Sequence, residues 1–74
     1  MLVKLEAYHD GECWCARGVG VSVFTQGETF EELLTNAREA LGLHFEEKLE
    51  QGDVLQVLIL TETEVRGVSQ ASAG

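Results

Sequence analysis

Apolar and polar residues alternate along the first third of the chain, which is the pattern of half-buried β-strands. The alternation predicts strands over residues 2–8, 12–17 and 19–24. Asp10-Gly11 lies between the first two extended runs, and this dipeptide is the strongest short-range signal for a hairpin turn. A glycine after the second run provides the next reversal. The first third of the chain therefore predicts an antiparallel meander of three strands.

The hydrophobic period changes after Gly27, which is expected to be a turn residue with a positive φ. Thr29 and Glu32 then form a capping box, in which the threonine hydroxyl accepts from the N3 amide and the glutamate reaches back to the N-cap amide. Apolar positions recur at roughly 100° per residue, which predicts an amphipathic helix of about five turns over residues 30–50. Gly42 is expected to kink this helix, or to stop it early with a second short turn behind it. The apolar face contains Phe30, Leu33, Leu34, Ala37, Ala40, Leu41, His44 and Phe45.

A fourth strand is predicted over residues 54–60, of which residues 57–60 are apolar on both faces. The expected fold is therefore a small α+β domain, β-β-β-α-β, in which the meander and the fourth strand carry one helix on one face. Residues 1–68 are expected to form this single domain, and residues 69–74 a flexible C-terminal tail. An uncovered apolar sheet face in so small a chain predicts a homodimer or higher homo-oligomer. The expected interface residues are Trp14, Leu58 and Leu60.

The acidic net charge of the chain indicates which class of partner it can bind. Thirteen acidic residues against five basic ones give a formal net charge of −8. Nucleic-acid binders gather Lys and Arg on one face, but here the basic residues are scattered singly, so we expect no direct DNA binding. A basic protein partner suits this charge, because opposed charges speed encounter and suppress wrong partners. The expected partner-binding surface is an acidic stripe opposite the apolar helix face, made of Glu28, Glu32, Glu39, Glu46 and Glu50.

The sequence also bears on location. No apolar run approaches the ~20 residues of a membrane span, and the N-terminus lacks the apolar core of a signal peptide. We therefore expect no membrane association and a cytoplasmic protein.

Cys13 and Cys15 offer the main alternative chemistry. They lie two residues apart, so on a strand they face the same way, and half of a zinc site with His9 or His44 as further ligands is one interpretation. Structural zinc sites usually use two clustered pairs, and no second pair follows. The favoured interpretation is two buried thiols that act as small hydrophobic residues, with no metal and no cofactor.

No catalytic residue is expected. No Ser-His-Asp or Cys-His order stands out, and His44 is expected to pack on the apolar helix face. Glu6, Asp10 and Glu12 are the only strand or hairpin acids that could hold a divalent metal for a nuclease, with Glu6 facing Glu12 across the hairpin. We interpret them as a solvated face around a turn, and expect that the chain is not an enzyme; a metal-dependent nuclease remnant ranks last among the alternatives.

Several of these motifs together resemble the HicB-like antitoxin family. The resemblance lies in Asp10-Gly11, in Trp14-Cys15-Ala16, in TQGETFEEL over residues 25–33 and in NAREAL over residues 36–41. It covers about residues 1–60 and implies a partial RNase H-like architecture. Leu33-Leu34 departs from the family, where Ala commonly follows the Glu.

The resemblance also implies a function. Members of the family bind and neutralise a HicA-type toxin, a small basic mRNA interferase, and complete members add a C-terminal DNA-binding module. Only residues 61–74 follow Leu60, too few for such a module. The expected function is a non-enzymatic protein-binding module that masks such a toxin. The alternative is an orphan homo-oligomer with a structural or regulatory role and no cognate toxin.

Overall fold

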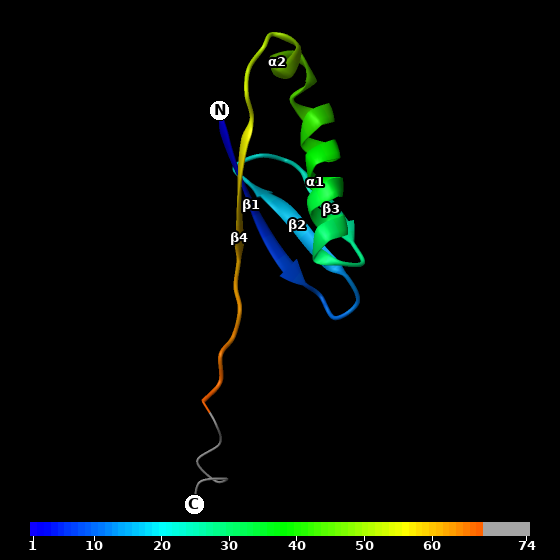
Figure 1. Ribbon diagram of the computed structural model, residues 1–74, viewed down its shortest axis with the longest axis vertical. Coiled ribbons are helices and arrows are strands. Elements are labelled where there is room, and N and C mark those ends of the chain that lie inside the picture. Colours follow the sequence, from blue (N-terminus) through cyan, green and yellow to red (C-terminus); the bar gives the residue numbers. More distant parts are fainter. Residues whose placement is uncertain (68–74) are drawn as a thin grey trace, which may run out of the picture.

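Strand β1 (Leu2–His9) is one of the two inner strands of a four-stranded mixed sheet, as Figure 1 shows in the computed structural model, which describes residues 1–67. The remaining elements follow as β2 (Trp14–Val19), β3 (Phe24–Gly27), α1 (Phe30–His44), α2 (Glu46–Glu50) and β4 (Gln56–Thr61). The predicted α+β class and the β-β-β-α-β order are confirmed. The tail expected over residues 69–74 lies outside the described residues.

The strand order in the sheet is β3-β2-β1-β4. β1 pairs antiparallel with β2, and β2 with β3, which confirms the predicted meander. β4 then pairs parallel with β1 on the opposite side, so α1 carries the chain from one edge of the sheet to the other. Parallel strands require such a crossover, and an α-helix is its usual form. β3 and β4 are therefore the two edge strands.

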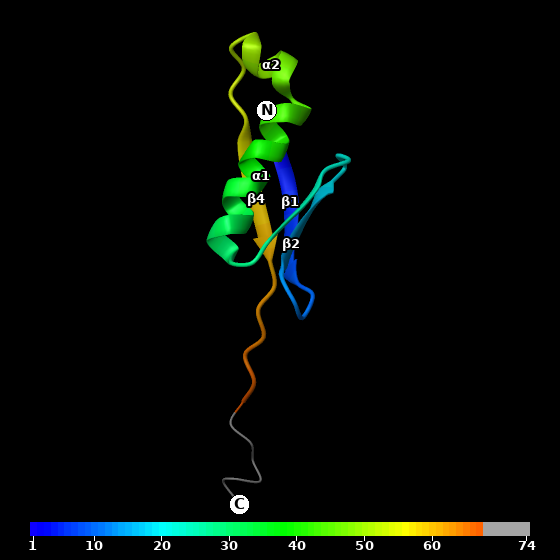
Figure 2. The ribbon, with the colours of Figure 1, turned by 90° about the vertical axis from the view of Figure 1, so that its right-hand side faces the viewer.

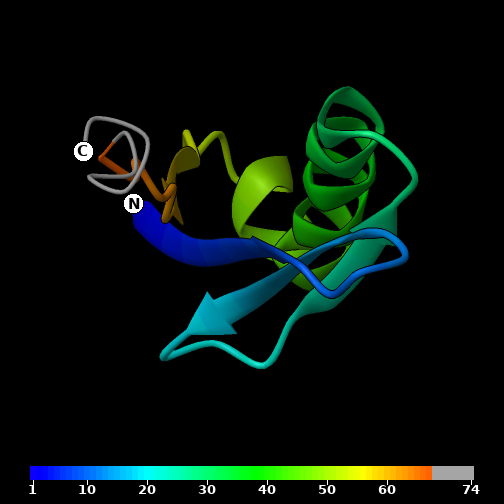
Figure 3. The ribbon, with the colours of Figure 1, turned by 90° about the horizontal axis from the view of Figure 1, so that it is seen from below.

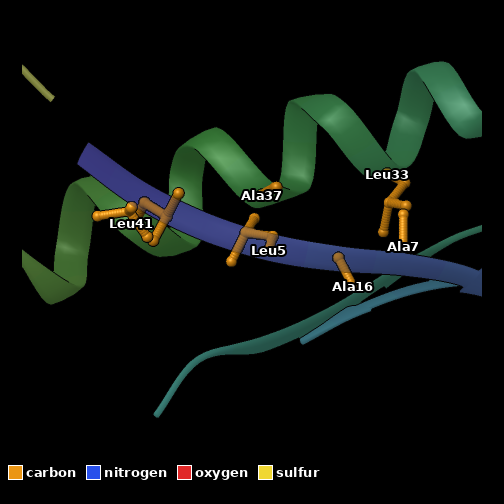
Figure 4. Packing of buried hydrophobic residues seen from close by; sticks show 7 residues of the cluster. Leu5, Ala7, Ala16, Leu33, Ala37 and Leu41 are labelled. Carbon is orange, nitrogen blue, oxygen red and sulfur yellow. The ribbon is translucent and has the colours of Figure 1, made fainter. Parts of the chain in front are cut away.

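One face of the sheet packs against α1 (Figure 2). The alternation in β1 buries every second side chain, because successive residues of a strand point to opposite faces. Leu33, Ala37 and Leu41 recur along α1 at helical spacing and pack against β1 (Figure 4). Burying the apolar face of a helix on a sheet is the main source of stability in so small a domain. The buried core cluster consists of Val3, Leu5, Ala7, Ala16, Leu33, Ala37 and Leu41.

The second and third strands lie later in the chain than predicted. β2 runs on to Val19, and the chain reverses at Gly20, so residues 20–23 form a connection rather than a strand. Gly18 N–H donates to the carbonyl oxygen of Val23 at 2.8 Å, and Val21 and Val23 turn inward against the core. Tertiary packing thus overrides the β-propensity of the valines. β3 instead begins at Phe24, the last residue of the predicted third strand, and ends at Gly27, which was expected to be a turn residue.

Gly27 is the last residue of β3 and lies against the first turn of α1. The prediction that it has a positive φ is wrong. Its φ is not positive; only Gly11, Gly20 and Gly52 have positive φ among the described residues. A Cβ on Gly27 would lie 2.5 Å from the backbone nitrogen of Leu33. The position therefore requires glycine for close approach of strand and helix, not for a turn conformation.

The predicted capping box is present in a slightly shifted form. The Thr29 hydroxyl accepts from the Glu32 backbone N–H at 3.0 Å, as expected. The Glu32 carboxylate accepts from the backbone N–H of Glu28 at 2.8 Å, one residue before the expected N-cap amide. Together the two bonds fix the start of α1 immediately after Gly27.

The predicted long helix is divided at Phe45 rather than at Gly42. Phe45 has φ −110° and ψ 28°, and it separates α1 from the single turn of α2. The bend leaves Phe45 partly buried against the core, whereas Leu43 and His44 are exposed. Gly42 lies within α1, and nothing lies within 4 Å of where its Cβ would be.

Two glycine-to-alanine variants test these placements. We expect Gly27→Ala to lower the free energy of unfolding by about 1–3 kcal/mol, because the added methyl meets backbone that must move. Gly42→Ala is the matched control, and it should raise stability by up to about 1 kcal/mol, because alanine favours the helix. Urea denaturation followed by circular dichroism measures both. Equal effects of the two substitutions would contradict the close approach at Gly27.

Candidate functional site

Strand β4 is the most exposed regular element of the sheet. None of its six residues is buried, and Ile59 alone is partly buried. On the helix side Val57 is 37% exposed, although its neighbour Val3 on β1 is 5% exposed. Seen from below, α1 lies over the β2 and β3 side of the sheet, with β4 beyond it (Figure 3). The helix therefore covers β1 but leaves β4 accessible on both faces and along its outer edge.

The face of the sheet opposite α1 carries further exposed apolar side chains. Leu58 and Leu60 lie beside Lys4 and Glu6 of β1 on this uncovered face. Both leucines are exposed, which agrees with the predicted position of these two interface residues on the uncovered face, although their role in an interface stays a prediction. The other exposed apolar residues on the strands of this face are Leu2, Tyr8, Val19 and Phe24.

Trp14 does not lie on the uncovered face, and the prediction that placed it there is wrong. It neighbours Gly27 in the sheet and packs partly buried against the core on the helix side. Its ring meets Phe30 of α1 edge-on with centroids 5.0 Å apart, and His9 edge-on with centroids 5.4 Å apart. The sequence indicated this position of Trp14, because residues two apart on a strand lie on the same face and Ala16 is buried.

The five glutamates of the expected acidic stripe are all exposed but do not form one continuous row. Glu32 and Glu39 lie on α1, and the Glu32 carboxylate is used in the helix cap. Glu28 precedes the helix, while Glu46 and Glu50 lie on α2 beyond the break at Phe45. The acidic surface is thus spread over three segments, because the helix does not continue straight through Phe45.

The hairpin between β1 and β2 assembles a polar cluster on the uncovered side. Gly11 adopts φ +101°, so the predicted Asp-Gly turn is confirmed. The Asp10 Oδ1 atom accepts from the backbone N–H groups of Glu12 and Cys13, both at 2.9 Å. These bonds hold the carboxylate in the turn, as aspartate side chains commonly do. The Oδ2 atom of Asp10 is left to face the two cysteines.

The two thiols meet that oxygen. The Sγ atoms of Cys13 and Cys15 lie 4.0 Å apart, and the Asp10 Oδ2 atom lies 3.9 Å and 3.6 Å from them, respectively. Cys15 is 2% exposed and Cys13 is half-buried. The prediction of two buried thiols is confirmed for Cys15 but not for Cys13. Sequence reasoning did not include Asp10 in the group, although the D-x-x-C-x-C spacing around the Asp-Gly turn carried that signal.

Two opposite pKa shifts follow from this geometry. Donation from the backbone N–H groups of Cys13 and Glu12 lowers the pKa of the Asp10 carboxyl from its usual value. Burial, followed by the hydrogen bond with Cys13 and the negative charge of Asp10, raises the pKa of the Cys15 thiol to about 11. A carboxylate is therefore held beside a thiol that stays protonated at neutral pH.

Neither histidine is a member of the cluster, although the Nδ1 atom of His9 accepts from the backbone N–H of Gly11 at 3.1 Å in the same turn. His9 turns to the helix side toward Trp14, and His44 lies at the end of α1 with its ring edge-on to Phe45. His44 is exposed, so the expectation that it packs on the apolar face is wrong.

Glu6 faces Arg17 in the sheet and forms an ion pair with it at 3.1 Å, so it does not lie opposite Glu12 as expected. The nuclease interpretation needed Glu6, Asp10 and Glu12 as a clustered set. Over residues 1–67, the one group of three or more potential metal ligands is instead Asp10, Cys13 and Cys15.

No family model, curated protein or solved structure matches the chain. The HicB-like resemblance therefore stays a hypothesis that rests on the motifs alone. Neither helix in the described part of the chain has the length and apolar character that a bilayer crossing requires.

Differential alkylation tests the cysteine environment. At pH 8 in the native, reduced protein we expect iodoacetamide to modify Cys13 at least ten times faster than Cys15, which is buried and has a raised pKa. Because only the thiolate reacts, raising the pH from 8 to 10 should increase the thiolate fraction of Cys15, and so its rate, by about a hundredfold. Fragmentation mass spectrometry of the shared peptide locates the modification. In urea both residues should react alike, and equal rates in the native protein would contradict the burial of Cys15.

Proposed function

We propose that the protein is a non-enzymatic protein-binding module that receives its partner along β4. The observation that supports this proposal most is the exposure of β4, an edge strand with apolar residues on both faces. An edge strand presents unpaired backbone N–H and C=O groups, and apolar patches of this kind mark interaction sites. A partner strand added to β4 would satisfy the backbone groups and cover the apolar side chains together.

The hydrogen-bond direction along β4 identifies which groups are free for a partner. Gln56 N–H donates to the carbonyl oxygen of Met1 at 2.8 Å, toward β1. Because N–H groups of a strand point alternately to its two sides, those of Val57, Ile59 and Thr61 point to the open edge. These three residues would form the main-chain contacts of an added strand.

Charge favours a basic protein as this partner. The net charge is −8, and exposed acids lie close to both ends of β4, with Asp53 before it and Glu62 and Glu64 after it. Glu64 forms an ion pair with Arg66, so the other two remain available. A basic surface would be steered to this edge. The HicB-like resemblance suggests the class: a small basic mRNA interferase of HicA type, which the module would mask in the cytoplasm, where such a toxin finds its substrate.

A matched pair of proline variants tests docking on β4. Val57→Pro removes an N–H that points to the open edge but leaves the β1–β4 bonds in place, and proline is tolerated on edge strands. We expect it to weaken binding to the small basic protein encoded in the adjacent reading frame at least tenfold, as measured by titration calorimetry. Val65→Pro is the control, because Val65 is 91% exposed and lies beyond β4.

Co-expression provides the functional readout. The wild-type chain and Val65→Pro should relieve growth inhibition by that basic protein, and Val57→Pro should relieve it less. Equal affinities of the two variants would contradict docking on β4. The lack of a basic protein in the neighbouring reading frames, or of any binding to it, would contradict the proposed partner.

A second candidate function is a homo-oligomer without a toxin partner, and the same strand favours it. Identical edges can pair across a two-fold axis, which would bring Leu58 and Leu60 of one copy near those of the other. Each copy carries the same net charge of −8, so the two copies repel each other.

Salt dependence therefore separates the two candidates. We expect salt to strengthen self-association, because it screens the repulsion, and to weaken a complex with a basic partner. If β4 pairs with itself, sedimentation velocity should give about 16 kDa, twice the chain mass of 8.1 kDa, and Val57→Pro should restore the monomer. A wild-type monomer at high micromolar concentration and high salt would contradict the homo-oligomer.

A further inference from the structure

The hairpin cluster has the dimensions of one face of a zinc coordination tetrahedron. Its three potential ligand atoms are separated by 4.0 Å between the two Sγ atoms and by 3.9 Å and 3.6 Å from each Sγ to Asp10 Oδ2. Tetrahedral zinc with Zn–S of about 2.3 Å and Zn–O of about 2.1 Å places two sulfurs ~3.8 Å apart and a sulfur and an oxygen ~3.6 Å apart. Shifts of a few tenths of an ångström bring the three atoms to these separations.

The ligand atoms are held in place by the fold, so little order has to be gained on binding. Asp10 uses Oδ1 for the two backbone N–H groups of the turn and keeps Oδ2 directed toward the sulfurs. Cys15 lies on β2 between its sheet neighbours Tyr8 and Gln26, which restrict its position. Cys13 lies in the turn itself and is fixed by its backbone N–H bond to Asp10. Ligand groups that folding has already ordered bind a metal more tightly, because their conformational entropy does not have to be lost again when the ion binds.

The donor set selects a thiophilic ion. Two sulfurs and one carboxylate oxygen suit zinc, whereas magnesium and calcium take oxygen ligands almost exclusively. Three protein ligands leave the fourth tetrahedral position to water, on the side where Asp10 is exposed to solvent. We propose that Asp10, Cys13 and Cys15 bind one zinc ion, which joins the two ends of the β1–β2 turn.

The binding step balances simply. Each thiol releases a proton to solvent as its sulfur forms a bond to zinc. The hexaaqua ion releases five waters and keeps one, so that three protein atoms and one water complete the tetrahedron. The divalent ion offsets two of the three negative charges that the two thiolates and the carboxylate would otherwise place within 4.0 Å of one another. No oxidant or reductant takes part. The site is independent of the proposed docking on β4, since none of its ligands lies on that strand.

Titration of the reduced full-length chain with zinc alone tests the site, using competition with a chromophoric chelator. We expect one zinc per chain, and at least about tenfold weaker binding for Cys13→Ser and Asp10→Asn. Asparagine keeps the side-chain acceptor that the turn requires, so Asp10→Asn should remain folded by circular dichroism. Glu12→Gln is the matched control, because it removes the same charge two residues away, and the Glu12 side chain takes no part in the cluster; its affinity should equal that of the wild type.

Cobalt substitution and thiol protection give independent readouts. Cobalt(II) bound to the wild-type chain should show thiolate-to-metal charge-transfer absorption in the near ultraviolet, reduced in Cys13→Ser. Zinc should slow the alkylation of Cys13 at least tenfold, and a chelator should restore the rate. The proposal is overturned if Asp10→Asn and Glu12→Gln bind zinc alike, if no charge-transfer band forms, or if the thiols of the zinc-loaded sample react or oxidise to a disulfide as fast as those of the free chain.

Discussion

One helix has to cover a sheet of four strands, and most of the structure depends on which of these strands the helix covers and which it leaves exposed. α1 packs its buried residues over β1 and the neighbouring meander, and it leaves β4 accessible on both faces. Val3 and Val57 show the result, because they are sheet neighbours on the same face with 5% and 37% exposure. β4 is therefore attached to the domain by its pairing with β1, and its apolar side chains gain less from burial than those of β1.

The same constraint connects the fold to the proposed function. A strand that the domain's own helix cannot cover keeps both its apolar side chains and its outer backbone groups available, which is what a partner strand needs. Acidic residues close to both ends of β4 add selectivity against partners of like charge, and they do so against a second copy of this chain as well. The proposed partner, an added strand on a protein with a basic surface, would cover the apolar side chains of β4 and offset the acidic residues near its ends.

Local signals made part of this structure predictable from the sequence. The Asp10-Gly11 turn, the Thr29 cap and the helical apolar face depend on neighbouring residues, and each is present. Features decided by distant packing were not predictable in the same way. Val21 and Val23 turned inward instead of extending a strand, and Gly27 is required by the approach of α1 rather than by its own turn. The sequence showed β4 only as a run that is apolar on both faces, and its accessibility depended on which strands the helix covers.

The hairpin cluster combines both kinds of information. Cys13 and Cys15 share a face because of strand alternation, which the sequence shows, whereas the approach of Asp10 Oδ2 depends on the turn folding back over them. The cluster lies beyond the last β1 residue that pairs with β4, Ala7, so a bound ion would stiffen the β1–β2 turn without touching the β4 edge. Docking and metal binding are therefore separable through their residues. Both sites are connected to β1, because β1 pairs with β4 along one side and its C-terminal end leads into the β1–β2 turn.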